Sequence, residues 1–290
     1  MDPDGDSPYF PRELEREIFE TAAELYPETI PTLLLVALRV LEWIEPLGYR
    51  TFFLAETRST SQRFRFLQHA IQSKPAHFIR TNIWYLLAGT TFTAGTLNDV
   101  LPHCTGIRSL VLFHACPSML SQLKDTQPRR LAIPIASLFH DQDTRVMDFT
   151  LPFFACLTHL DVFEILNDLN SWSSSWTTLG LLPGLTHLAF LELCESALIA
   201  EILVTCTKLK VLIGMHSEAP PSWEDMPNIP VDEARFVSMA VSTTDYIMDW
   251  EVGTKGGMDF WARADAFVAK RRRGEIEPRS RHWIEDRDEI

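Results

Sequence analysis

The chain has 290 residues, 46% of them hydrophobic, with 18 Phe and 8 Trp, which is enough apolar material for one or two domains with a large core. Its formal net charge of -13 at pH 7 argues against a general nucleic-acid-binding protein, because an acidic surface repels phosphates. A membrane-spanning helix is not expected either. The best apolar run, Leu33–Leu41, follows Pro31, contains Arg39 and is shorter than the roughly 18 residues such a helix needs.

The cysteines and the first residues indicate a cytoplasmic and/or nuclear protein. The five cysteines are an odd number without a C-x-x-C pair, so we expect buried, reduced thiols rather than a disulfide framework or a zinc ribbon. Asp2, Asp4 and Asp6 occupy positions where a secretory signal carries Lys or Arg.

Residues 1–50 are predicted to form a small helical module. Pro11 suits a first helical position, and Leu14, Ile18, Ala22 and Leu25 recur at helical spacing after it. A second element, residues 32–44, is apolar around its whole circumference and would be a stable helix only if it were covered on nearly every side. Residues 1–28 hold nine acidic and two basic side chains, which indicate either a solvated helix face or a docking face for a basic partner.

Short strand-like runs follow in residues 51–243. Two of them share the frame L-x-x-C-T-x-(I/L)-(R/K)-x-L, at Leu101–Leu110 and Leu203–Leu212. The central leucines of the runs are separated by 24, 21, 29, 28 and 24 residues, by subtraction of their numbers: Leu86, Leu110, Leu131, Leu160, Leu188 and Leu212. This spacing fits leucine-rich repeats of about 20 to 29 residues. We therefore predict an α/β fold, an irregular leucine-rich-repeat solenoid of short parallel strands with returning helices.

Several features of this region lead to further predictions. Helices are expected at residues 61–73 and 197–204, and a proline-rich surface loop at residues 217–230. The sequence Leu-Thr-His-Leu occurs twice and places His159 and His187 at one repeat position. These two histidines are candidates for binding a target protein. The Asn that commonly follows the strand of a leucine-rich repeat is absent, so we expect irregular curvature.

The last residues are predicted to close the solenoid. A final strand is expected at residues 235–241, and helices at residues 245–251 and 259–273 form a cap over residues 244–277. Residues 278–290 are expected to be a disordered tail. The run Lys270–Arg273 indicates either a nuclear import signal or a cationic last helical turn that ends at Gly274.

The segments FPRELEREIF and TLLLVALRVLEWIEPLGYRTFFL resemble a degenerate F-box. The Pro-x-Glu-Leu pattern begins at Pro11, Ile18 and Phe19 follow it, and Trp43 comes late in the second apolar helix. Together with the irregular repeats and the closing DFWARADAFVAKRRRGEIEP, the chain resembles fungal F-box-like proteins. It departs from the F-box pattern where Phe10-Pro11 replaces Leu-Pro and where the usual Val-Cys-Arg before the Trp is missing.

The resemblance implies a non-enzymatic adaptor of a cullin-RING ubiquitin ligase. An F-box docks a Skp-type linker subunit, and through it a cullin, so the expected linker-binding residues are Pro11, Leu14, Ile18, Phe19, Leu34, Leu38 and Trp43. The repeat surface would hold an unknown target protein. The alternative is a stand-alone interaction scaffold in which the F-box-like helices only cap the solenoid and pack against the first repeats.

Catalytic and cofactor sites are not expected. The sequence has no Gly-x-Ser-x-Gly and no phosphate loop, since GTKGG at residues 253–257 lacks the required spacing and reads as a turn. His103-Cys104, His114 and Cys116 lie close in sequence but lack a second ligand pair for zinc. Cys104 and Cys206 occupy equivalent repeat positions, where a small buried side chain is wanted. We expect no metal, no cofactor, no nucleic acid and no membrane among the partners.

Overall fold

The structure is a computed structural model that describes residues 10–55, 60–139, 147–163, 177–191, 196–219 and 233–290. The fold is α/β, with an all-parallel sheet of eight strands that follow one another in chain order. The strands are β1 (Thr51–Leu54), β2 (Tyr85–Ala88), β3 (Ser109–Leu112), β4 (Arg130–Ile133), β5 (His159–Val162), β6 (His187–Leu191), β7 (Val211–His216) and β8 (Phe236–Ala240).

The register explains the spacing of the leucines. Each of the six leucines found in the sequence pairs with the next across the sheet, and the row extends to Phe52 in β1 and Phe236 in β8. All members of the row are buried. Side chains alternate between the two faces of a strand, so residues one position further along, such as Leu87 and Ile213, belong to a second core on the opposite face.

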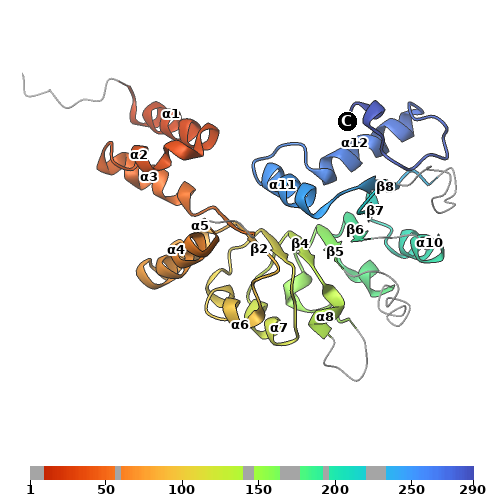
Figure 1. The fold of residues 1–290 in the computed structure, drawn as a ribbon, viewed down its shortest axis with the longest axis horizontal. Helices are drawn as coiled ribbons and strands as arrows, with labels where there is room; N and C mark the ends of the chain where they lie inside the picture. The colour runs from red at the N-terminus through yellow and green to blue at the C-terminus, as the bar shows by residue number, and fades with distance from the viewer. Residues whose placement is uncertain (1–9, 56–59, 140–146, 164–176, 192–195, 220–232) are drawn as a thin grey trace, which may run out of the picture.

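One face of the sheet is covered by short helical segments that connect the strands. In Figure 1 these helices follow the outer side of the curved sheet. They are α4 (Thr60–Ser73), α5 (Ala76–Asn82), α6 (Ala94–Leu97), α7 (Ser118–Leu123), α8 (Ile135–Phe139) and α10 (Ser196–Thr205), with 3-10 turns at Leu101–His103, Pro152–Phe154 and Thr177–Leu181. The connections are compact. At Gly106, an added Cβ would lie 1.7 Å from the Arg80 carbonyl oxygen, so only glycine fits there.

The opposite face is covered by α11 (Thr243–Thr254) and α12 (Phe260–Arg273), as Figure 1 shows. Their apolar side chains join the second core, and the Trp250 indole Nε1 donates a hydrogen bond to Ser109 Oγ in β3. The expectation of a cap at the last repeat is therefore corrected. Phe260, Ala264 and Phe267 are buried as predicted, but the two helices extend back over the sheet face as far as β1, where the Trp250 and Phe53 rings lie 6.3 Å apart.

The C-terminal residues are ordered against the sheet, which corrects the prediction of a disordered tail at residues 278–290. Backbone hydrogen bonds join Ser238 of β8 to His282 and Ile284. The guanidinium of Arg281 makes two hydrogen bonds to the Asp288 carboxylate, at 2.7 and 2.8 Å, and both side chains are buried. A 3-10 turn at Asp286–Asp288 ends the chain. The charged residues that indicated a solvated tail form hydrogen-bonded ion pairs with one another instead.

The N-terminal helices are α1 (Arg12–Leu25), α2 (Ile30–Leu33) and α3 (Leu38–Gly48), with a 3-10 turn at Pro27–Thr29. They lie apart from α11 and α12 at one end of the molecule (Figure 1). The single helix predicted for residues 32–44 is wrong, because the backbone becomes extended at Ala37, with φ -162° and ψ 156°, and separates α2 from α3.

The other predicted elements agree with the structure. The helices expected near residues 61–73, 197–204 and 259–273 are α4, α10 and α12, and the expected last strand is β8. Gly274 ends α12 in the left-handed region, with φ 74°. Most of the proline-rich segment at residues 217–230 lies outside the described residues.

Candidate partner-binding site

The N-terminal helices have a small core of their own. Ala23 of α1 packs with Val40 and Ile44 of α3, and a ring of partly buried apolar side chains surrounds these three. Three of the seven residues predicted to bind a linker subunit belong to this ring: Phe19, Leu34 and Trp43. These side chains hold the helices together and offer a partner only part of their surface.

Other predicted residues face solvent. Leu14 is 48% exposed, Ile18 is 54% exposed and Leu38 is 74% exposed, and Pro11 is also exposed. Leu14 and Ile18 are four residues apart on α1, so they share one helix face. The structure thus divides the predicted set between an internal core and a solvent-exposed group.

The break at Ala37 adds two exposed residues that the sequence did not predict. Leu35 is 86% exposed and Val36 is 55% exposed, because the chain turns between α2 and α3 and cannot cover them. Sequence reasoning placed them in a fully covered helix, and no Gly or Pro marks the break. We refer to Leu14, Ile18, Leu35, Val36 and Leu38 as the exposed apolar set.

Ion pairs lie next to the exposed apolar set, and one of them joins two of these helices. Arg39 of α3 makes a bidentate contact with Glu15 of α1, at 2.7 and 3.0 Å, next to Leu38 and Leu14 in the sequence. The hydrogen bond from Arg39 lowers the pKa of Glu15. On α1, Arg16 pairs with Glu20 at 2.8 Å. The exposed apolar set therefore lies among charged side chains that are already partly paired.

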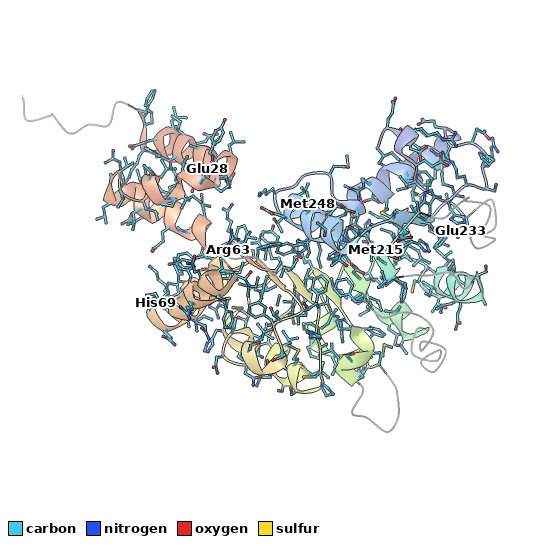
Figure 2. All side chains as sticks on the ribbon, in the orientation of Figure 1. Glu28, Arg63, His69, Met215, Glu233 and Met248 are labelled. Atoms are coloured by element: carbon cyan, nitrogen blue, oxygen red, sulfur yellow. The ribbon has the colours of Figure 1, made fainter. Side chains whose placement is uncertain are left out.

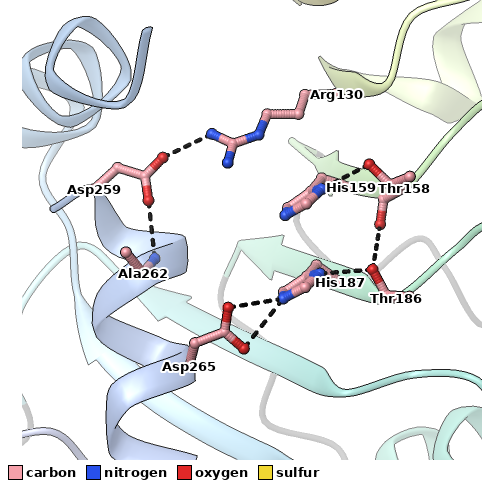
Figure 3. Close-up of polar contacts among 8 residues, drawn as sticks. All are labelled: Arg130, Thr158, His159, Thr186, His187, Asp259, Ala262 and Asp265. Atoms are coloured by element: carbon pink, nitrogen blue, oxygen red, sulfur yellow. Dashed lines mark hydrogen bonds and ion pairs between the residues drawn. The ribbon is translucent and has the colours of Figure 1, made fainter. Parts of the chain in front are cut away.

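The two histidines of the repeated Leu-Thr-His-Leu sequence lie under α12 (Figure 3). Their rings stack with centroids 4.1 Å apart and an interplanar angle of 2°. The Nδ1 atom of each ring is bonded to the hydroxyl of the preceding threonine, Thr158 or Thr186, at 2.9 and 2.8 Å. The motif thus places both rings in a fixed orientation on the covered face.

Contacts from α12 complete the surroundings of the histidines. His187 Nε2 lies 3.1 Å from Asp265 Oδ2, and the indole of Trp261 meets His159 edge-on with centroids 5.1 Å apart. Burial, followed by the neighbouring charges, lowers the pKa of His159 to about 2. Since both rings are engaged by the chain's own helix, they offer little surface to a target protein.

A polar group beside the histidines joins the sheet to the start of α12. Asp259 accepts a hydrogen bond from the Ala262 N–H at 2.9 Å, and its other oxygen lies 2.8 Å from an Arg130 nitrogen (Figure 3). Asp161, one strand over from Arg130, is only 1% exposed, and burial raises its pKa to about 8. Burial and the Asp161 carboxyl also raise the pKa of Tyr246.

This polar group does not form a substrate site. The cavity that it lines has a volume of about 20 Å³, which is room for roughly one water molecule. Within the described residues, no group of three or more His, Cys, Asp and Glu side chains could hold a metal ion.

The cysteines follow the repeat pattern only in part. Cys104 and Cys206 are buried at equivalent positions, as predicted, and burial raises their pKa values to about 12 and about 11. Cys156 is exposed and Cys116 is only partly buried, so the expectation of buried thiols is wrong for these two residues. Cys194 lies outside the described residues.

The basic run at the end of α12 is also engaged within the chain. Lys270 Nζ contacts the Asp288 carbonyl oxygen, and Arg271 Nη1 donates to the carbonyl oxygens of Glu233 and Phe236 at 3.1 and 3.0 Å. Arg272 remains exposed, and Arg273 pairs with Glu275. Half of the run thus stabilises the C-terminal segment.

Comparisons with known proteins give no relative: the chain matches no protein-family model, no curated protein and no solved structure. In the part of the chain that the structure describes, no helix has both the length and the apolar character required to cross a membrane.

Proposed function

We propose that the chain is a non-enzymatic, substrate-recruiting adaptor of a cullin-RING ubiquitin ligase of the SCF type. In this proposal, the N-terminal helices form an F-box-like module that binds a Skp-type linker subunit, and the sheet with its helices forms an irregular leucine-rich-repeat solenoid that binds a target protein. The observation that carries the proposal is the exposed apolar set on helices that already have a core of their own. Between 48% and 86% of each of these residues is exposed, and burying each one against a partner would gain up to about 3 kcal/mol.

The solenoid part of the proposal is supported by the topology. Strands in sequential order, parallel pairing and a continuous row of buried leucines are what stacked repeats of one strand and one returning segment produce. The target surface must lie outside the face beneath α11 and α12, because His159 and His187 are held there by α12.

The mechanism of such an adaptor is proximity. Holding a target and the ligase on one molecule converts their encounter into an intramolecular event, and this raises the effective concentration of the target at the ubiquitin-transfer site. The chain itself would perform no bond chemistry.

The experiment is capture of a purified linker subunit by the full-length chain. The variant Ile18→Asp/Leu38→Asp should weaken binding at least tenfold, because it would place two charges in an apolar interface. The matched control is Val204→Asp, which alters an apolar side chain that is 77% exposed on α10, far along the sheet. Val204→Asp should bind like the unmodified chain. Equal capture by all three proteins, or no capture by any, would contradict the proposal.

The alternative is a stand-alone scaffold whose N-terminal helices only cap the sheet. Two ion pairs between α1–α3 and the rest of the chain favour it: Arg50 with Glu24 at 2.7 Å, and Lys74 with Glu45. A cavity of about 570 Å³ between these helices, β1 and the end of α11 shows, however, that the helices do not pack closely over that end of the sheet. In Figure 2, Glu28 of the N-terminal helices and Met248 of α11 are labelled on either side of this region.

A further inference from the structure

A row of cationic and aromatic side chains marks the edge of the sheet at which the strands begin. Arg50, Trp84, Arg108 and Arg129 directly precede β1, β2, β3 and β4. Backbone hydrogen bonds of 2.7–3.1 Å connect each to the next, from Trp84 N to the Arg50 oxygen, from Arg108 N to the Trp84 oxygen and from Arg129 N to the Arg108 oxygen. The four residues therefore lie on neighbouring strands, at one strand spacing of about 4.8 Å.

Trp84 positions the two arginines beside it. The Arg108 guanidinium lies 3.7 Å from the centroid of the Trp84 ring, and that of Arg50 lies 4.6 Å away. The indole Nε1 donates to the Thr81 carbonyl oxygen at 2.7 Å, which fixes the ring. A guanidinium stacked on an aromatic face keeps its N–H donors directed outward and available to an anion.

The charges of this row are only partly neutralised. Arg50 pairs with Glu24, and Arg130, the first residue of β4, pairs with Asp259. Among the described residues, the structure records no carboxylate in contact with the side chains of Arg108 or Arg129, both of which are exposed. Two unneutralised guanidinium groups on adjacent strands stand out in a chain whose net charge is -13.

The arginine side chains line a cleft. Arg108, Arg129 and Arg130 line a cavity of about 250 Å³, whose other described lining residues are Tyr85, Ser109, Trp250, Gly253 and Thr254. None of these lining residues is acidic. The carbonyl oxygens of Val252 and Gly253 in the last turn of α11 already accept hydrogen bonds from the N–H groups of residues 255–257. These bonds weaken the partial negative charge at this end of the helix.

We propose that this cleft binds the phosphate group of a small phosphate monoester. A dianionic phosphate matches the two guanidinium groups of Arg108 and Arg129, and planar guanidinium groups bind phosphate oxygens in a bidentate manner. The volume of about 250 Å³ is below the roughly 300–1,000 Å³ of a typical drug-sized pocket, so the organic part of the phosphate ester must be small. Tyr85 and Trp250 provide aromatic surface for it. An extended nucleic acid is disfavoured because the rest of the molecule is strongly acidic.

The test is calorimetric titration of the full-length protein at low salt with phenyl phosphate as the probe. We expect saturable binding to one site that weakens at least tenfold in Arg108→Gln/Arg129→Gln. The matched control is Arg65→Gln/Arg272→Gln, which removes two exposed arginines outside the cleft and changes the net charge by the same amount. The control should change affinity less than about twofold, and circular dichroism checks that each variant is folded.

Two further probes identify the source of the phosphate. Inorganic phosphate that binds as tightly as phenyl phosphate would assign the cleft to the free anion, whereas a several-fold preference for phenyl phosphate would assign it to the ester; both results support the site. No saturation up to roughly 10 mM probe, or equal weakening in both double variants, would overturn it. Tighter binding of a dinucleotide phosphodiester would also overturn it in favour of nucleic acid. The site does not depend on the proposed adaptor function.

Discussion

Asp161 is the residue at which burial and charge are in clearest conflict. It occupies a strand position that faces α11, where the neighbouring strands carry Ala132 and Ala189. Burial raises its pKa to about 8, so the folded protein holds a neutral carboxylic acid at neutral pH. Relative to an ordinary Asp, this costs on the order of 4 kcal/mol near pH 7. The cost is present in the folded state and absent in the unfolded chain.

Asp161→Asn should therefore stabilise the protein, and the gain should grow with pH. The folded pKa lies above the unfolded value of 3.8, so the folded state binds more protons and the unmodified chain loses stability as pH rises from about 4 to about 8. The amide cannot ionise. Thermal or urea unfolding should show a gain that is roughly 2 kcal/mol larger at about pH 8 than at about pH 6.

Asp99→Asn is the control for this substitution, because Asp99 is exposed and the same charge is removed. It should change stability by less than about 0.5 kcal/mol at either pH.

His159 gives the free energy of unfolding the opposite dependence on pH, and it does so at lower pH. Burial lowers its pKa to about 2, so the unfolded chain binds its proton first and stability falls as pH drops below about 6.5. A gain for Asp161→Asn that is independent of pH would show that the carboxyl is ionised in the folded protein.

At the scale of elements, the strands could be predicted because their pattern is local. In a strand covered on one face by its own return segment, positions such as Leu110 and Leu112 must both be apolar, and the sequence shows this directly. β1 did not appear among the predicted repeats because Phe52 replaces leucine in the buried row. The break at Ala37 carries no Gly or Pro and depends on packing between α2 and α3.

Long-range contacts account for the remaining differences between the predictions from the sequence and the structure. The repeat spacing predicts that His159 and His187 lie side by side on neighbouring strands, but the strand pattern does not determine which helix covers them. The tail residues Arg281 and Asp288 look solvated in sequence because each is charged, and their pairing becomes evident only in three dimensions. The cleft beside Arg108 and Arg129 is likewise formed by segments more than a hundred residues apart in sequence, since Trp250 is part of its wall.

The start of α12 offers a test at this scale. Asp259→Ala should destabilise the protein by roughly 2 kcal/mol, because it removes both the cap acceptor for Ala262 N–H and the partner of Arg130. Asp259→Asn keeps the cap acceptor and should cost about half as much. The comparison is Ser242→Ala, which removes the cap of α11 at the Asp245 N–H together with the exposed hydrogen bond from the Ser242 hydroxyl to the Asp245 carboxylate, and should cost about 1 kcal/mol. Urea denaturation measures all three, and equal costs for Asp259→Ala and Ser242→Ala would show that the Arg130 contact contributes nothing.

At the scale of the whole molecule, the two ends of the chain relate differently to the sheet. The N-terminal helices have a separate small core, whereas α11, α12 and the tail share the second core with the strands. A buried Trp or Phe contributes about 1.5–3 kcal/mol, and a domain has only about 5–15 kcal/mol of net stability. Losing the C-terminal helices would uncover several such residues at once, including Trp250, Phe260, Trp261 and Phe267.

Removing the N-terminal helices and removing the C-terminal helices should therefore have opposite effects on cooperative folding. A chain that begins at Tyr49 should keep a cooperative thermal transition, because Tyr49 and every strand remain, while a chain that ends at Val241 should lose it. In the intact protein, hydrogen exchange should show the amides of α1–α3 opening independently of the strand amides. If the chain that begins at Tyr49 instead unfolds or aggregates, the N-terminal helices are a structural cap, and the stand-alone scaffold becomes the better account of these helices.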